Sequence, residues 1–187
     1  MKLSVAQDKL ARSLAVVGRA VATRSTLPIT THVLLKAGSS SLELSATNLE
    51  ISISCRIDAE VASEGSIAVP ARLLTEFVTS LQPDLVSMEL SSATKQLELS
   101  SGRVNAKLTG QSADDFPVTP NLEDGINLQI PAEKLRLCIE RVSFAAATDD
   151  ARPVLTGIHT SFRKAVPQVG AIFDETDHTA GLNPYFS

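Results

Sequence analysis

The 187-residue chain has no tryptophan, one tyrosine and only 4% aromatic residues. Proteins that stack unpaired bases use aromatic side chains, so a platform for single-stranded nucleic acid is not expected. The chain also has only two cysteines, Cys55 and Cys138, which lie far apart. A disulfide framework or a zinc site would need more cysteines at closer spacing, so both are expected to be free, buried thiols.

Long hydrophobic runs are also absent. No run approaches the roughly 18 residues of a membrane-spanning helix, and the N-terminal residues lack the apolar segment of a secretory signal. With 43% hydrophobic and 20% charged residues, the composition is that of a globular protein, which we expect in the cytoplasm.

Motifs for catalysis are scarce. The chain has neither a glycine-rich phosphate loop nor a nucleophile elbow. His32, His159 and His178 show no metal-ligand spacing. We therefore expect no metal, no cofactor and no catalytic activity.

Two acidic pairs leave one enzymatic alternative open. The pairs at 114–115 and 149–150 each lie shortly before a proline. A metal bound near Asp114 or Asp149 would indicate a small metalloenzyme. Acidic residues before a proline are more typical of turns and caps, and this is the interpretation that we favour.

One helical pattern occurs three times. Segments that begin at Val5, Val69 and Ile130 carry apolar residues five, nine and twelve positions later. Steps of four and three residues place such side chains on one face of a helix. The three faces are Leu10, Leu14 and Val17; Leu74, Val78 and Leu81; and Leu135, Ile139 and Val142. The residues just before each helix alternate with period two, which predicts three strand–helix units.

The first and third units match over a longer stretch, at an offset of 125 residues; Pro28 and Pro153, for example, form a matched pair. A period this long indicates a duplicated domain. The acidic, proline-rich stretch 113–125 is interpreted as the connection between the copies. We expect a complete first domain at 1–120, a linker at 121–127, a partial second domain at 128–162 and an unmatched tail at 163–187.

Strand-like segments lie between the helices. Six stretches alternate apolar with polar residues, at 31–37, 41–47, 50–58, 86–92, 95–101 and 103–110. Such alternation predicts antiparallel strands with one buried and one solvated face. The expected fold class is α+β, built from duplicated strand–helix–strand units with helices in one layer and antiparallel sheets in the other.

The net charge of −4 is unevenly distributed. Residues 1–24 carry five cations against one acid, whereas residues 25–71 carry five acids against two cations. Helical spacing places Lys9, Arg12 and Arg19 away from the apolar face. Such a cationic helix layer would suit a phosphate backbone, although an ordinary solvated helix face would show a similar pattern.

Six motifs occur in order along the chain: RSTLPIT, LELSATNLEISI, VPARLL, SGRVNAKL, DDFP and ARPVLTG. Together they resemble the N-terminal part of the bacterial DNA polymerase III beta subunit, the sliding clamp, over residues 1 to about 162. The resemblance implies the DNA clamp fold and a homodimeric ring of two head-to-tail subunits, each of three similar domains. Such a ring encloses duplex DNA without sequence preference and tethers the polymerase as a non-catalytic processivity factor. Polymerase and clamp-loader subunits would be its protein partners.

The resemblance also implies roles for individual residues. Arg24 and Arg72 resemble DNA contacts, and the charge pattern adds Lys9, Arg12, Arg19 and Arg136. Arg103, Lys107 and Leu108 resemble the edge strand that pairs with the neighbouring subunit. Arg152 and Leu155 resemble part of the pocket for a short peptide motif of polymerases and clamp loaders.

No family motif continues after about residue 162. We therefore expect a truncated clamp chain that lacks a third domain and does not close a ring. Residues beyond that point are expected to be poorly ordered or irregularly packed. The alternative is a protein-interaction scaffold that uses the same fold without DNA, and a neutral or acidic helix face would favour it.

Overall fold

The computed structural model describes residues 1–22, 27–91, 93–117, 128–149 and 152–161. The chain divides into two compact units, Met1–Asn121 and Leu122–Ser187, and each is described by itself. Arg24 and the tail from residue 162 onward, for which irregular packing is expected, lie outside the described residues.

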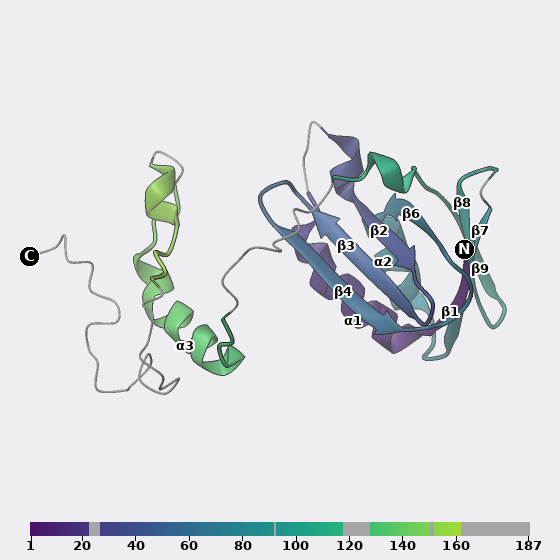
Figure 1. The fold of residues 1–187 in the computed structure, drawn as a ribbon, viewed down its shortest axis with the longest axis horizontal. Coiled ribbons are helices and arrows are strands. Elements are labelled where there is room, and N and C mark those ends of the chain that lie inside the picture. Colours follow the sequence, from purple (N-terminus) through teal and green to yellow (C-terminus); the bar gives the residue numbers. More distant parts are fainter. Residues whose placement is uncertain (23–26, 92, 118–127, 150–151, 162–187) are drawn as a thin grey trace, which may run out of the picture. The chain divides into compact units, whose positions relative to one another are not determined.

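The first unit alternates single helices with runs of strands (Figure 1). Its elements are β1 (Lys2–Ala6), α1 (Gln7–Val17), β2 (His32–Ala37), β3 (Ser41–Thr47), β4 (Ser52–Asp58), β5 (Glu60–Ser63), β6 (Gly65–Pro70), α2 (Ala71–Ser80), β7 (Leu85–Ser91), β8 (Gln96–Ser101) and β9 (Val104–Thr109). Short 3₁₀ helices lie at Gly18–Ala20 (η1), Pro28–Thr31 (η2) and Ala113–Asp115 (η3). All six strands predicted between the helices are present, and so are β1 and β6, the strands predicted just before the first two helices. The four-residue β5 was not predicted, because it is too short to show an alternating pattern.

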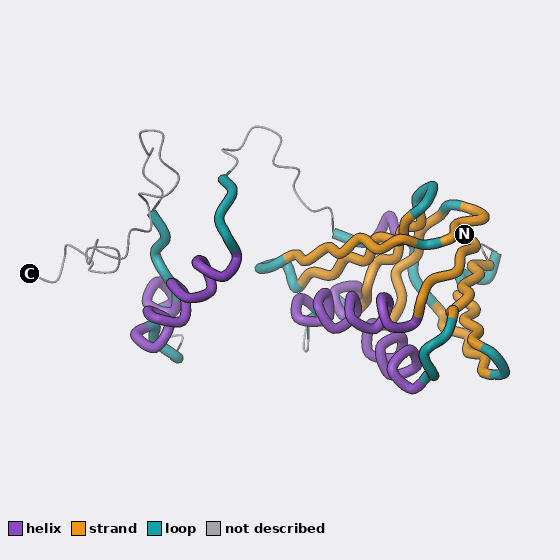
Figure 2. Tube along the Cα trace, turned by 90° about the horizontal axis from the view of Figure 1, so that it is seen from below, coloured by secondary structure: helices purple, strands orange, loops and turns teal. Residues whose placement is uncertain are grey.

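The strands form two antiparallel sheets, in the orders β5-β1-β7-β8-β9 and β4-β3-β2-β6. The strands that lead into the helices are exchanged between the two halves of the unit. β1 pairs with β7, which follows α2, and β6 pairs with β2, which follows α1. The exchange joins the two strand–helix halves into one body. The two helices contact each other and lie on one side of the strands (Figure 2).

The core lies between the helices and the sheets. All six apolar residues predicted for the first two helix faces are buried, and Leu10 and Leu74 are fully enclosed. The inward-facing positions of both sheets, such as Leu44 and Met88, complete the same cluster. Burying one such side chain stabilises a fold by about 1.5–3 kcal/mol, so the helix faces hold the two layers together.

A second, smaller cluster fastens the segment after β9. Phe116 is only 7% exposed and packs with Ile29 and Ala68. Just before it, Gln111 and Ala68 exchange two backbone hydrogen bonds of 2.8 and 3.1 Å. The interpretation of 113–125 as a connection is therefore wrong for residues 113–117, because this acidic, proline-rich stretch includes an aromatic anchor that docks on the first unit.

The second unit repeats the helical part of the first. Its elements α3 (Ala132–Val142), η4 (Ser143–Ala145) and η5 (Pro153–Thr156) begin and end 125 residues after α1, η1 and η2 (132 against 7, 142 against 17). The strand predicted just before α3 is not formed, and residues 128–131 have no regular structure. A strand needs a neighbouring strand with which to form hydrogen bonds. The described part of this unit contains no other strand.

Candidate nucleic-acid interface

The outward faces of α1 and of the 3₁₀ helix η1 that follows it carry two of the predicted cations. Because Leu10 and Leu14 point into the core, Arg12 lies on the opposite face, with its side chain 82% exposed. Arg19 follows in η1 and is also exposed. The Arg12 guanidinium lies 3.5 Å from the Asp8 carboxylate one turn earlier. Arg19 has no ion-pair partner among the residues that the structure describes.

Lys9 does not share this face. Its ammonium lies 3.2 Å from the carboxylate of Asp58, at the end of the edge strand β4. The ion pair holds the lysine at the flank of α1, beside the four-stranded sheet. Lys9 is therefore directed toward the edge of the sheet, whereas Arg12 pairs within its own helix.

Arg72 is the corresponding cation on α2. Its side chain is 87% exposed, and its Nε donates a 2.7 Å hydrogen bond to Glu76 Oε1. This hydrogen bond and the charge of Glu76 raise the pKa of Arg72, so the guanidinium remains protonated at any physiological pH. Because α1 and α2 pack side by side (Figure 2), Arg12, Arg19 and Arg72 belong to one exposed helix layer.

Arg136 and Arg24 are the remaining predicted DNA contacts. Arg136 is on α3 of the second unit and pairs with Glu133 at 3.2 Å and Glu140 at 2.7 Å. Arg24 lies outside the described residues.

Charge segregation between the layers is only partial. The described helix layer of the first unit carries Lys9, Arg12, Arg19 and Arg72 together with Asp8 and Glu76. The layer is therefore cationic on balance, as expected. It also includes two acids, and each of them forms an ion pair with an arginine of the same helix.

The predicted subunit-interface residues lie on or beside β9. Among the described strands, β9 pairs only with β8, so it is an edge strand. Arg103 is exposed in the turn that precedes it, and Lys107 forms an ion pair with Glu98 across to β8. Leu108 is only 9% exposed, and its side chain lies in the core of its own unit. An external strand would thus meet the backbone of Leu108 and not its side chain.

The two predicted peptide-pocket residues are in the second unit. Arg152 and Leu155 are both exposed and stand at η5. The Arg152 carbonyl accepts a 2.9 Å hydrogen bond from the Leu155 amide, and the Leu155 carbonyl accepts another from Ala147. These bonds tie Ala147 and Arg152 to Leu155.

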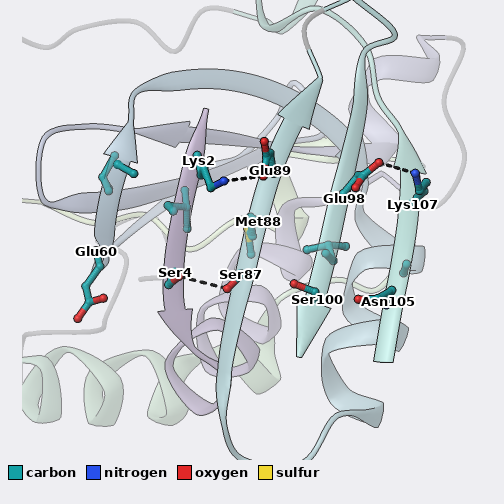
Figure 3. Close-up of a pocket in the computed structure, with 15 residues that line it drawn as sticks. Lys2, Ser4, Glu60, Ser87, Met88, Glu89, Glu98, Ser100, Asn105 and Lys107 are labelled. Carbon is teal, nitrogen blue, oxygen red and sulfur yellow. Dashed lines mark hydrogen bonds and ion pairs between the residues drawn. The ribbon is translucent and has the colours of Figure 1, made fainter. Parts of the chain in front are cut away.

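The outer face of the five-stranded sheet contains a polar hollow of about 730 Å³ that sequence reasoning missed (Figure 3). Lys2 pairs with Glu89 at 2.9 Å, and Glu98 pairs with Lys107. Glu89 and Glu98 lie directly opposite each other on β7 and β8. In the sequence, these residues were visible only as polar positions that alternate with apolar ones in each strand. Which of them lie side by side depends on the register between the strands, which the sequence pattern does not give.

The structure also bears on metal sites, membrane-spanning helices and cysteine chemistry. In the described ranges, no three His, Cys, Asp or Glu side chains gather closely enough to hold a metal ion, and no helix is long and apolar enough to cross a membrane. Asp114 accepts a 3.1 Å hydrogen bond from Ser112 within the η3 turn. Cys55 and Cys138 are free thiols, as expected, but half-buried where full burial was predicted.

Comparisons with known proteins agree with this architecture. Residues 1–120 match the family model of the DNA polymerase III beta subunit, N-terminal domain. The chain belongs to the DNA polymerase III beta subunit family. Its structure is similar to the DNA polymerase III subunit beta from Pseudomonas aeruginosa, with a TM-score of 0.78 and 33% identity over 84% of this chain and 43% of that one. The fold is therefore that of the sliding clamps.

Curated relatives in this family give the same result. The chain is 36% identical over 162 residues to the beta sliding clamp of Synechococcus elongatus, covering 85% of this chain and 43% of the relative. It is 28% identical over 170 residues to the beta sliding clamp of Chlamydia pneumoniae, covering 90% and 46%. The chain thus spans about half the length of the curated relatives that it matches.

Proposed function

We propose that this chain binds duplex DNA without sequence preference, through the exposed helix layer of its first unit, as part of a sliding clamp. The observation that supports the proposal is that Arg12, Arg19 and Arg72 are exposed on α1, η1 and α2, and that the two α-helices pack against each other. Membership of the beta subunit family supports it.

The contact would be made to phosphates. Arginine side chains that extend from a helix layer can reach the backbone of a duplex, and backbone contacts carry no sequence information. Acids such as Glu43, Glu89 and Glu98 lie on the outer faces of the two sheets, away from the buried side chains. Each of these acids is paired with a cation, Arg56, Lys2 or Lys107, so the proposal rests on the helix arginines and not on repulsion by the sheets.

The proposal includes the wider setting of the family. The chain would act as a non-catalytic processivity factor in the cytoplasm, with polymerase and clamp-loader subunits as partners. The open edge of β9 would remain available to pair with a strand of a second subunit, without closing a ring, and Arg24 would add a phosphate contact. Arg152 and Leu155 would contribute to the site for a partner peptide.

A salt titration of duplex binding tests the DNA contact. Arg12→Ala and Arg19→Ala should each weaken binding and reduce the slope of log affinity against log salt by up to about 0.9, the value for one lost phosphate contact. The matched control is Arg56→Ala, which removes a cation paired with Glu43 on the outer face of the four-stranded sheet. Equal effects of all three substitutions would refute a specific helix interface. Absence of duplex binding by the parent at low salt would favour the protein-interaction scaffold.

A further inference from the structure

Each of the three α-helices holds an exposed arginine against an acid of the same helix. Arg12 lies 3.5 Å from Asp8, and Arg72 lies 2.7 Å from Glu76. On α3, Arg136 is bound on both sides, by Glu133 and Glu140. Of the described arginines proposed to contact DNA in the first unit, Arg12 and Arg72 therefore already have an anionic partner, and Arg19 has none among the described residues.

The Arg72–Glu76 pair is poorly placed to serve helix stability. An acid is favourable near the N-terminus of a helix and a cation near the C-terminus. Asp8 follows this rule on α1, but on α2 the cation Arg72 is in the first turn and Glu76 comes four residues later. This order is the less favourable one for an ion pair one turn apart. Helix stabilisation therefore accounts for the Asp8–Arg12 pair but not for the Arg72–Glu76 pair.

The pairs are also easily broken. The side chains of Arg12 and Arg72 and their carboxylate partners are all more than half exposed. Exposed ion pairs contribute about 0–1 kcal/mol, so a phosphate can displace the carboxylate at small cost. Each acid occupies the place that an incoming phosphate would take.

We propose that Asp8 and Glu76 limit the affinity of the helix layer for duplex DNA by competing with phosphates for Arg12 and Arg72. The inference rests on the proposed function and concerns how tightly the helix layer holds the duplex. A duplex must displace a carboxylate at each of these arginines, and the carboxylate returns when the phosphate moves on. Contacts of this kind are weak and short-lived, as lateral movement along DNA requires.

The isosteric substitutions Asp8→Asn and Glu76→Gln test the competition in the full chain. Each should tighten binding to a labelled duplex by about two- to fivefold at low salt, the equivalent of one exposed ion pair. Each should also steepen the dependence of affinity on salt, because the freed arginine displaces additional counterions. The control is Glu43→Gln, which makes the same change of net charge at the Arg56 pair on the sheet face.

A double-mutant cycle separates competition from a general change of charge. In an Arg72→Ala background, Glu76→Gln should have no more effect on duplex affinity than Glu43→Gln, because the residue it competes for is gone. Glu76→Gln preserves a good helix former, so it carries the test if Asp8→Asn lowers stability at the N-terminus of α1. Parent-like affinity of both isosteres, with the parent binding normally, would overturn the competition and leave the proposed function intact. A parent that does not bind duplex would overturn both.

Discussion

Leu10 and Leu135 occupy the same position in two copies of one helix, 125 residues apart, but Leu10 is fully buried and Leu135 is 37% exposed. In the first unit, strands β3 and β4 lie against α1. In the described part of the second unit, no strand covers α3. The helix forms in both units, so the local sequence sets its backbone conformation. The burial of its apolar face depends instead on strands from other parts of the chain.

A matched pair of substitutions should reveal this difference. Leu14→Ala should lower the free energy of unfolding by about 2–5 kcal/mol, because it leaves a cavity in the core. The equivalent Ile139→Ala should cost less than about 1 kcal/mol, because Ile139 is already 43% exposed and alanine favours the helix. Urea unfolding, followed by circular dichroism, measures both free energies. A similar loss of stability in the two variants would contradict the different burial of Leu14 and Ile139.

Leu108→Ala should destabilise the first unit by about 2–4 kcal/mol, because the side chain lies in its core. Arg103→Ala, in the exposed turn beside it, should change the free energy of unfolding by less than about 0.5 kcal/mol. Unfolding curves at two protein concentrations distinguish core from interface. If Leu108→Ala altered only the dependence on concentration, its side chain would belong to a subunit interface.

Phe116→Ala should release the segment after β9. The substitution removes the aromatic anchor of the small cluster with Ile29 and Ala68, at a cost of roughly 3 kcal/mol. Limited proteolysis should then cleave within residues 113–117 faster than in the parent. Asp115→Ala, an exposed neighbour in the same turn, is the control. Equal cleavage of parent and Phe116→Ala would show that the anchor does not hold the segment.

Gly110→Ala should be strongly unfavourable. A Cβ atom at this position would lie 2.5 Å from Ile67 Cδ1 and 2.6 Å from the Ala68 carbonyl oxygen, and the backbone atom cannot move aside easily. Overpacking of this kind costs about 1–3 kcal/mol, which should appear as a lower Tm. Gly38→Ala is the control, since its nearest contact would be an ordinary 3.7 Å. An unchanged Tm for Gly110→Ala would mean that the two sheets can separate at this junction.

Part of the candidate interface could be predicted from the sequence. Arg12 and Arg19 are seven residues apart and lie opposite an apolar face, so helical periodicity alone placed them outward. The same reasoning grouped Lys9 with them, and it could not foresee the ion pair to Asp58, 49 residues further along the chain. The Glu89–Glu98 opposition was also out of reach, because strand register depends on pairing between strands.

The sequence by itself determined the local features of this protein: the three described helices with their apolar faces, eight of the nine described strands as separate segments, and the 125-residue repeat. These follow from periodicity, which depends only on neighbours along the chain. The tertiary structure alone decided that β1 and β6 exchange between sheets, that α1 is covered while α3 is exposed, and that Lys9 is paired with Asp58 of β4. Each of these depends on which side chains and strands meet in space, and no local pattern contains that information.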